Sequence, residues 1–83
     1  MKQDILYFVE KFVERMKRQK RAFSLEELER EYVKSVKKQN KQPVKWDNML
    51  RLTVVSKLLK KKEMQRTYQI RADGDTQAYF YIQ

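Results

Sequence analysis

The chain has 83 residues, of which 41% are hydrophobic and 37% are charged, and its formal net charge is +9. This composition is too apolar for a disordered segment and too charged for a membrane protein. No apolar run approaches the roughly 20 residues that a membrane-spanning helix needs. The length fits one small domain over residues 1–83 with one modest core.

Several other classes of protein are also disfavoured. The chain has no cysteine and no histidine, which excludes a disulfide and argues strongly against a metal site of the zinc type. The first residues mix acids and bases with apolar residues and do not resemble a signal peptide. We expect an intracellular protein that is nuclear in a eukaryote and otherwise cytoplasmic, with no membrane contact.

The positive charge is concentrated in one part of the chain. Residues 1–31 hold eight basic and seven acidic residues, whereas residues 32–62 hold ten basic residues and one acid, Asp47. Such a surface attracts polyanions and favours nucleic acid as a partner. The alternative is that these lysines only solvate the surface of a small domain.

The first predicted element is an amphipathic helix over residues 4–20. Its apolar residues recur at helical spacing and form one stripe, made of Ile5, Phe8, Val9, Phe12, Val13 and Met16. Residues 21–23 are expected to form a short extended link. We interpret the stripe as core packing, because a small domain needs every apolar face that it has.

A second helix is predicted over residues 25–39. Ser24 and Glu27 have the spacing of a capping box, and Phe23 and Leu28 have that of a hydrophobic staple. The residues that follow, 38–45, are the clearest polar connection, and it is longer than the three or four residues of a helix-turn-helix turn.

The third predicted helix, residues 47–62, is apolar around much of its circumference. Asp47 is the expected N-cap. The sequence allows two ways to pack this helix, because Leu50 and Val54 lie on a different side of it from the apolar ridge that contains Leu52 and Val55. Either Leu50 and Val54 are buried and Leu52 and Val55 are partly exposed, or the reverse holds. Aliphatic surface left exposed in either case indicates a protein partner.

A β-hairpin is predicted over residues 64–83. A two-residue turn would pair Tyr68 with Tyr79 and mix the two faces, whereas a three-residue loop, 72–74, with Gly74 in the left-handed conformation sorts them. We predict the three-residue loop. One face is then expected to cover the helices, and it comprises Met64, Arg66, Tyr68, Ile70, Ala78, Phe80 and Ile82. The solvent face comprises Gln65, Thr67, Gln69, Arg71, Gln77, Tyr79 and Tyr81.

The third helix and the hairpin carry a resemblance to a known superfamily. The arrangement of Thr, Val, Ser, Lys, Leu, Leu, Lys and Lys within residues 53–62, with an apolar residue, Met64, then opening a strand, resembles the third helix and wing of winged helix-turn-helix domains. Together with the order helix, short strand, helix, helix, hairpin, this implies an α+β fold, a small winged-helix domain with three helices and a C-terminal β-hairpin wing. In that superfamily the third helix usually enters the major groove of duplex DNA, and the hairpin touches the flanking backbone.

The leading hypothesis is therefore binding of duplex DNA through the third helix and adjacent lysines. The polar and basic residues expected to contact the groove or the phosphates are Lys45, Asn48, Arg51, Ser56, Lys57, Lys60, Lys61, Lys62 and Arg71.

Two alternatives remain open. The first is a winged helix that docks on another protein within a larger DNA or RNA processing complex, through Leu52 and Val55 or through Tyr79 and Tyr81. The two tyrosines could also stack on bases, although covering their cross-strand neighbours is the favoured interpretation. The second alternative is binding of structured or single-stranded RNA.

We expect no catalytic activity, no cofactor and no metal. The residues that most often act as nucleophile or base are missing, and a lone glycine, Gly74, excludes a glycine-rich phosphate loop. We also expect a monomer, because no helix is left over for a dimer interface.

Overall fold

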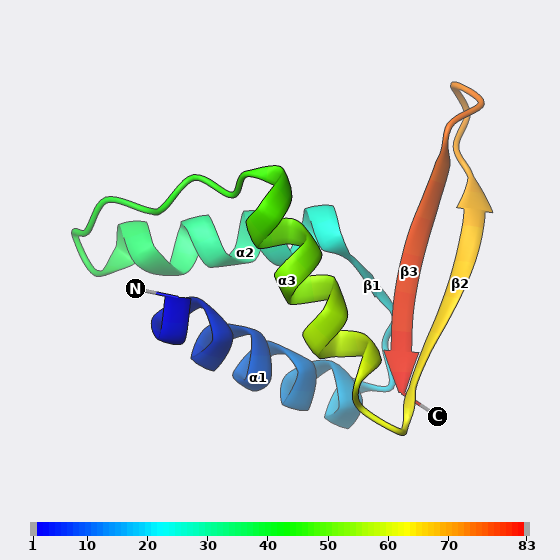
Figure 1. The fold of residues 1–83 in the computed structure, drawn as a ribbon, viewed down its shortest axis with the longest axis horizontal. Coiled ribbons are helices and arrows are strands. Elements are labelled where there is room, and N and C mark those ends of the chain that lie inside the picture. Colours follow the sequence, from blue (N-terminus) through cyan, green and yellow to red (C-terminus); the bar gives the residue numbers. More distant parts are fainter. Residues whose placement is uncertain (1, 83) are drawn as a thin grey trace.

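The structure is a computed structural model that describes residues 2–82. Within that range the elements are α1 (Lys2–Gln19), β1 (Phe23–Ser24), α2 (Leu25–Lys38), α3 (Asn48–Leu59), β2 (Met64–Ile70) and β3 (Thr76–Ile82). The strands form one antiparallel sheet in the order β1-β3-β2. Figure 1 shows the helices gathered together, with the β2–β3 hairpin standing beside them and its turn reaching beyond them. The expected α+β class with three helices and a C-terminal hairpin is confirmed.

The core joins α1 to the sheet through aromatic side chains. Phe12 of α1 meets Phe23 of β1 edge-on with 5.1 Å between ring centroids, and Phe23 lies 5.9 Å from Phe80 of β3. All three are at most 3% exposed. The apolar stripe predicted for the first helix is therefore part of the core, and β1 anchors the hairpin to it through its pairing with β3.

The start of α2 follows the predicted capping signal in part. The Ser24 hydroxyl accepts a hydrogen bond from the Glu27 N–H at 3.1 Å, and Phe23 and Leu28 are both buried. The Glu27 carboxylate, however, forms an ion pair with Arg21. The capping serine thus satisfies one of the free N–H groups at the helix start, while the glutamate fixes the preceding link.

The long connection between α2 and α3 is held by the core. Asn40 adopts a left-handed conformation with φ of 58° just after α2 ends, a conformation that commonly terminates helices. The Tyr32 hydroxyl accepts a hydrogen bond from the Val44 N–H at 3.2 Å, and the Trp46 ring lies 5.6 Å from the Tyr32 ring. Asp47 then caps α3 by accepting from the Leu50 N–H at 2.8 Å, as predicted.

The predicted end of the third helix is wrong by three residues. The helix ends at Leu59 instead of residue 62. The Lys61 N–H bonds to the Leu58 carbonyl, three residues earlier, at 3.2 Å, and the Met64 N–H bonds to the Lys61 carbonyl at 3.1 Å. These bonds tighten the chain into a turn, because Met64 must enter the sheet opposite Ile82.

The hairpin has the predicted register. Tyr68 pairs with Ala78, and the Arg71 N–H bonds to the Asp75 carbonyl at 2.7 Å across the three-residue loop. Gly74 has φ of 91° there, in the left-handed region that glycine adopts without cost. The predicted last residue of the hairpin, Gln83, lies outside the described residues.

One expectation about the hairpin faces is wrong. The face that contains Met64, Tyr68 and Ile70 was expected to cover the helices, but Tyr68 is 57% exposed and Ile70 is 79% exposed. Only its helix-proximal half, with Met64 and Phe80 buried, packs on the core. The reason is the length of the hairpin, whose turn end reaches beyond the helices (Figure 1).

Candidate nucleic-acid interface

One side of α3 packs into the core. Leu50, Val54 and Leu58 are spaced four residues apart, and each is at most 8% exposed. Residues at this spacing lie on one stripe of a helix. Of the two packings that the sequence leaves open, the structure has the one in which Leu50 and Val54 are buried and Leu52 is exposed. Val55 is half-buried at the edge of the core.

The opposite side of α3 faces solvent and is mainly apolar. Met49, Leu52 and Leu59 are 72%, 63% and 41% exposed, and Ser56 lies exposed among them. We call these four residues the exposed α3 face. The neighbouring Thr53 hydroxyl donates to the Met49 carbonyl at 2.9 Å. A ligand of α3 therefore meets aliphatic side chains first, with few polar groups free to contact it.

Basic side chains gather where α3 ends. Lys60 and Lys62 are exposed and Lys57 is half-buried. Among the side chains that the structure describes, these three lysines have no carboxylate within ion-pair distance. At 100° per residue, Lys57 and Lys60 lie along one flank of the exposed α3 face. These lysines agree best with the predicted role in phosphate binding.

Two predicted contact residues are engaged with other helices. The Arg51 Nη2 atom lies 3.3 Å and 3.4 Å from the two carboxylate oxygens of Glu29 on α2. The Lys61 Nζ atom lies 2.9 Å from Oε2 of Glu10 on α1. Both pairs are partly exposed, and such pairs typically contribute only about 0–1 kcal/mol to stability. Arg51 and Lys61 must therefore exchange a carboxylate for a phosphate to act as predicted.

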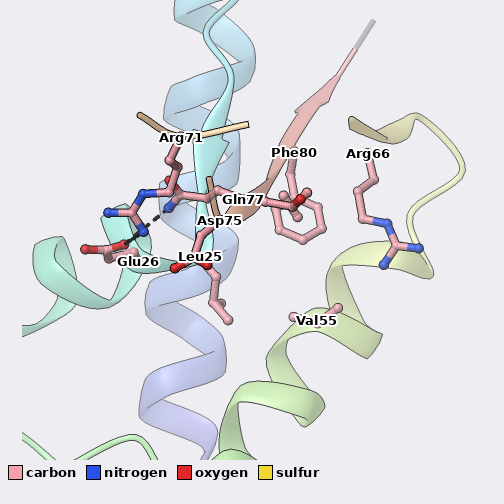
Figure 2. Close-up of a pocket in the computed structure, with 10 residues that line it drawn as sticks. Leu25, Glu26, Val55, Arg66, Arg71, Asp75, Gln77 and Phe80 are labelled. Atoms are coloured by element: carbon pink, nitrogen blue, oxygen red, sulfur yellow. Dashed lines mark hydrogen bonds and ion pairs between the residues drawn. The ribbon is translucent and has the colours of Figure 1, made fainter. Parts of the chain in front are cut away.

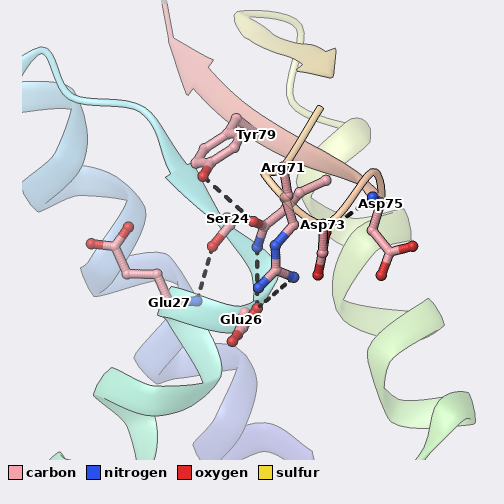
Figure 3. Close-up of polar contacts among 8 residues, drawn as sticks. Ser24, Glu26, Glu27, Arg71, Asp73, Asp75 and Tyr79 are labelled. Carbon is pink, nitrogen blue, oxygen red and sulfur yellow. Dashed lines mark hydrogen bonds and ion pairs between the residues drawn. The ribbon is translucent and has the colours of Figure 1, made fainter. Parts of the chain in front are cut away.

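Arg71 is likewise occupied, at the base of the hairpin loop. Its Nη1 atom lies 3.7 Å from Oε2 of Glu26, and the Gln77 Nε2 atom donates to the same oxygen at 3.2 Å. Figure 3 shows Glu26 at the start of α2 receiving both side chains. Glu26 thereby ties the hairpin to α2. Arg71 is better placed to hold the hairpin than to bind a phosphate.

The start of α3 offers two further predicted residues. Lys45 precedes the helix and Asn48 is its first residue, and both are exposed. They lie at the opposite end of α3 from Lys60 and Lys62. Lys45 and Asn48 therefore lie at the start of α3 and Lys57, Lys60 and Lys62 at its end, with Ser56 on the exposed α3 face between the two groups.

An open cleft of about 490 Å³ separates α3 from the hairpin (Figure 2). Val55, Ala78 and Phe80 supply apolar lining, and Arg66 and Arg71 supply cations. The Arg66 guanidinium also lies 5.4 Å from the centre of the Tyr68 ring. Val55 is on the flank of the exposed α3 face opposite Lys60. Cations therefore border this face on both sides.

The two tyrosines predicted as a stacking or partner face are half-buried. Tyr79 pairs with Thr67 on one side and Ser24 on the other, and Tyr81 pairs with Gln65. The Tyr79 hydroxyl donates to Oε1 of Gln77 at 3.5 Å (Figure 3). Thr67 and Gln65 are thus their cross-strand neighbours on β2, and that the rings cover these neighbours stays a prediction.

In α3 and the hairpin, sequence reasoning missed four exposed apolar side chains, Met49, Leu59, Tyr68 and Ile70. A signal for the first two was present. Once Leu50, Val54 and Leu58 are taken as the buried stripe, Met49 and Leu59 fall on the other side of the helix. No comparable signal identifies Tyr68 and Ile70, because their exposure depends on how far the hairpin projects.

The described side chains include no cluster of three or more acidic residues placed to hold a metal ion. None of the helices in residues 2–82 combines the length and apolar character needed to cross a bilayer. Comparison with protein-family models, curated proteins and solved structures finds no match to this chain.

Proposed function

We propose that the chain is a winged-helix domain that binds duplex DNA through α3 and its basic end. The order of elements supports this fold, since a short strand lies between the first two helices and a hairpin follows the third. The short strand adds to the hairpin in the order β1-β3-β2. In this arrangement α3 presents a solvent-facing side next to a projecting hairpin, the two elements that contact DNA in winged helices.

The observation that carries the proposal is the row of lysines at the end of α3. Among the described side chains, Lys57, Lys60 and Lys62 have no carboxylate partner. Their charge is therefore available to phosphates. Arg66 lies on the opposite flank of the exposed α3 face, beside the cleft. Cations on both flanks of one helix suit the two phosphate strands that border a groove, whose condensed counterions are released on binding.

The apolar character of the exposed α3 face is compatible with weak base selectivity. Leu52 and Met49 can contact thymine methyl groups, whereas a bidentate reader of guanine or adenine needs Arg, Asn or Gln there. Among the exposed residues in the first turn of α3, only Asn48 has a side chain of this type. We therefore propose binding that is dominated by the phosphate backbone.

The test is a charge reversal of Lys57, Lys60 and Lys62 to glutamate in one variant. Affinity for a random-sequence DNA duplex of about two helical turns, measured by fluorescence anisotropy at low salt, should fall by at least about tenfold. Circular dichroism should remain unchanged, since none of the three side chains belongs to the buried core.

The matched control reverses Lys37, Lys38 and Lys41, which changes the net charge by the same amount. These residues lie at the end of α2, far from the end of α3 (Figure 1). The control should lose clearly less affinity than the α3 variant. Equal losses would show that total charge, not the proposed surface, determines binding. Competition with an RNA duplex in the same assay distinguishes RNA as the preferred ligand.

A second candidate function is docking on another protein within a larger DNA or RNA processing complex. The exposure of Met49, Leu52 and Leu59 on one side of α3 favours it, because contiguous exposed apolar surface marks interaction sites. A Leu52→Asn variant separates the two functions, because it removes an aliphatic contact without adding a negative charge next to the phosphate-binding lysines. It should abolish a protein contact made by this face while keeping most duplex affinity, whereas failure of the wild-type protein to bind any duplex would leave docking as the better proposal.

A further inference from the structure

The outer edge of β2 is a second candidate interaction surface. β2 has seven residues and lies at one end of the sheet order, and no strand within residues 2–82 pairs with its outer side. Its pairing with β3 is continuous, without a bulge. Natural edge strands are usually protected by lysine, proline or bulges. β2 has none of these, and its single charge is Arg66.

The hydrogen bonds of the hairpin show which backbone groups point outward. Arg71 and Asp75 form a bonded pair next to the loop. Bonded and non-bonded pairs alternate in an antiparallel ladder, so the odd-numbered residues of β2 bond to β3. The N–H and C=O groups of the even-numbered residues therefore point away from β3, and these residues are Met64, Arg66, Tyr68 and Ile70. The Met64 N–H is bonded to the Lys61 carbonyl, so a partner strand can use both groups only at the other three.

We propose that a second copy of this chain pairs with β2 in antiparallel orientation, around a two-fold axis at Thr67. The axis places Arg66 opposite Tyr68 of the partner subunit and Met64 opposite Ile70 of the partner subunit. Each of these is a pair of outward-bonding residues, but the Met64 N–H is already held by the Lys61 carbonyl of its own chain. The two edges together therefore form about six backbone hydrogen bonds. The proposal is independent of nucleic-acid binding.

The side chains select this register over its neighbours. With the axis at Thr67, each Arg66 guanidinium lies next to an aromatic ring, an interaction that it already makes with Tyr68 of its own chain at 5.4 Å. An axis at Arg66 would place two arginines directly opposite, which destabilises a sheet. An axis at Tyr68 would leave Met64 and Gln65 without cross-strand partners in the other β2. Only the axis at Thr67 gives each of the seven residues of β2 a cross-strand partner in the β2 strand of the other copy.

The register also accounts for the unexpected exposure on the hairpin. Tyr68 and Ile70 are 57% and 79% exposed in one chain, and both gain cross-strand neighbours in the pair. Two-fold axes of antiparallel pairs stand perpendicular to the sheet. The two sets of helices would thus lie on the same face of one six-stranded sheet, at opposite ends of the paired hairpins, whose turns reach beyond the helices (Figure 1).

A cysteine at the axis tests the register. The chain has no native cysteine, so Thr67→Cys introduces a single thiol. Residues of a non-hydrogen-bonded antiparallel pair have Cα atoms about 4.5 Å apart, within the range that a disulfide spans. Mild oxidation with diamide should crosslink most of the Thr67→Cys protein. Gln65→Cys on the same face should stay uncrosslinked alone and should crosslink when mixed with Gln69→Cys.

A proline at an outward-bonding position tests the pairing itself. Tyr68→Pro removes an N–H that β3 does not use, and proline is tolerated on edge strands for that reason. Sedimentation equilibrium should show a dimer for the wild type and for Tyr68→Ala, and a dimer dissociation constant at least about tenfold higher for Tyr68→Pro. A wild-type chain that is monomeric at all concentrations, or a dimer that Thr67→Cys fails to crosslink, overturns the proposal.

Discussion

Two leucines of the same helix have opposite environments, which makes α3 the most informative element at the residue scale. Leu58 is fully buried and Leu52 is 63% exposed. Leu58→Ala should lower the free energy of unfolding by about 3 kcal/mol, since it removes buried methyl groups and leaves a cavity. Leu52→Ala should change it by no more than about 0.5 kcal/mol. Urea denaturation measures both.

A loss of several kcal/mol for Leu52→Ala would contradict the orientation of α3, because it would mean that the exposed α3 face is packed. The same orientation underlies both proposed functions. The leucine pair is its own control, since the substitution and the helix are identical and only the burial differs.

At this scale the sequence predicts contacts between close neighbours and misses distant ones. The capping roles of Ser24 and Asp47 were predictable because a cap bonds to an N–H three residues along the chain. The Arg51–Glu29 and Lys61–Glu10 pairs join residues 22 and 51 positions apart. They depend on how the helices cross, which no local pattern determines.

The hairpin is the element whose geometry is most directly testable. Gly74 has φ of 91°, and a Cβ built on it meets nothing within 4 Å. The cost of Gly74→Ala is therefore backbone strain alone, and the free energy of unfolding should fall by about 1–2 kcal/mol. Thermal or urea denaturation measures this change.

A D-alanine at position 74, introduced by chemical synthesis, provides the control. It favours positive φ, so it should be neutral or stabilising. If L-alanine and D-alanine had equal effects, the three-residue loop with a left-handed Gly74 would be incorrect.

At the scale of whole elements, the alternation of apolar and polar residues, together with Gly74 in the turn, was sufficient to predict the hairpin register. A shift of one residue would mix apolar and polar side chains on both faces of the hairpin. They were insufficient to predict that Tyr68 and Ile70 are exposed. That outcome depends on the length of the hairpin relative to the helices, a property of the assembled fold. The burial of Leu50 and Val54 was similarly open, because α3 is apolar on nearly all sides and either packing buries aliphatic residues.

For the molecule as a whole, the distribution of charge determines where a polyanion can bind. The acids of α1 and α2 neutralise one cation of α3, one in the turn after it and one in the hairpin, namely Arg51, Lys61 and Arg71. The predicted basic segment is therefore partly neutralised. Its lysines outside these ion pairs fall in two groups, Lys37, Lys38, Lys41 and Lys45 at the end of α2 and after it, and Lys57, Lys60 and Lys62 at the end of α3. The sequence predicted the excess but not this partition, which arises from the packing of α1 and α2 against α3.

The salt dependence of duplex binding tests the account most directly. The purified protein is titrated with a fluorescent random-sequence duplex at several salt concentrations. If Lys57, Lys60, Lys62 and Arg66 each contact one phosphate, log affinity should fall linearly with log salt with a slope of about −3 to −4. No binding at low salt, or an affinity that does not change with salt, would contradict a phosphate-binding surface at the end of α3.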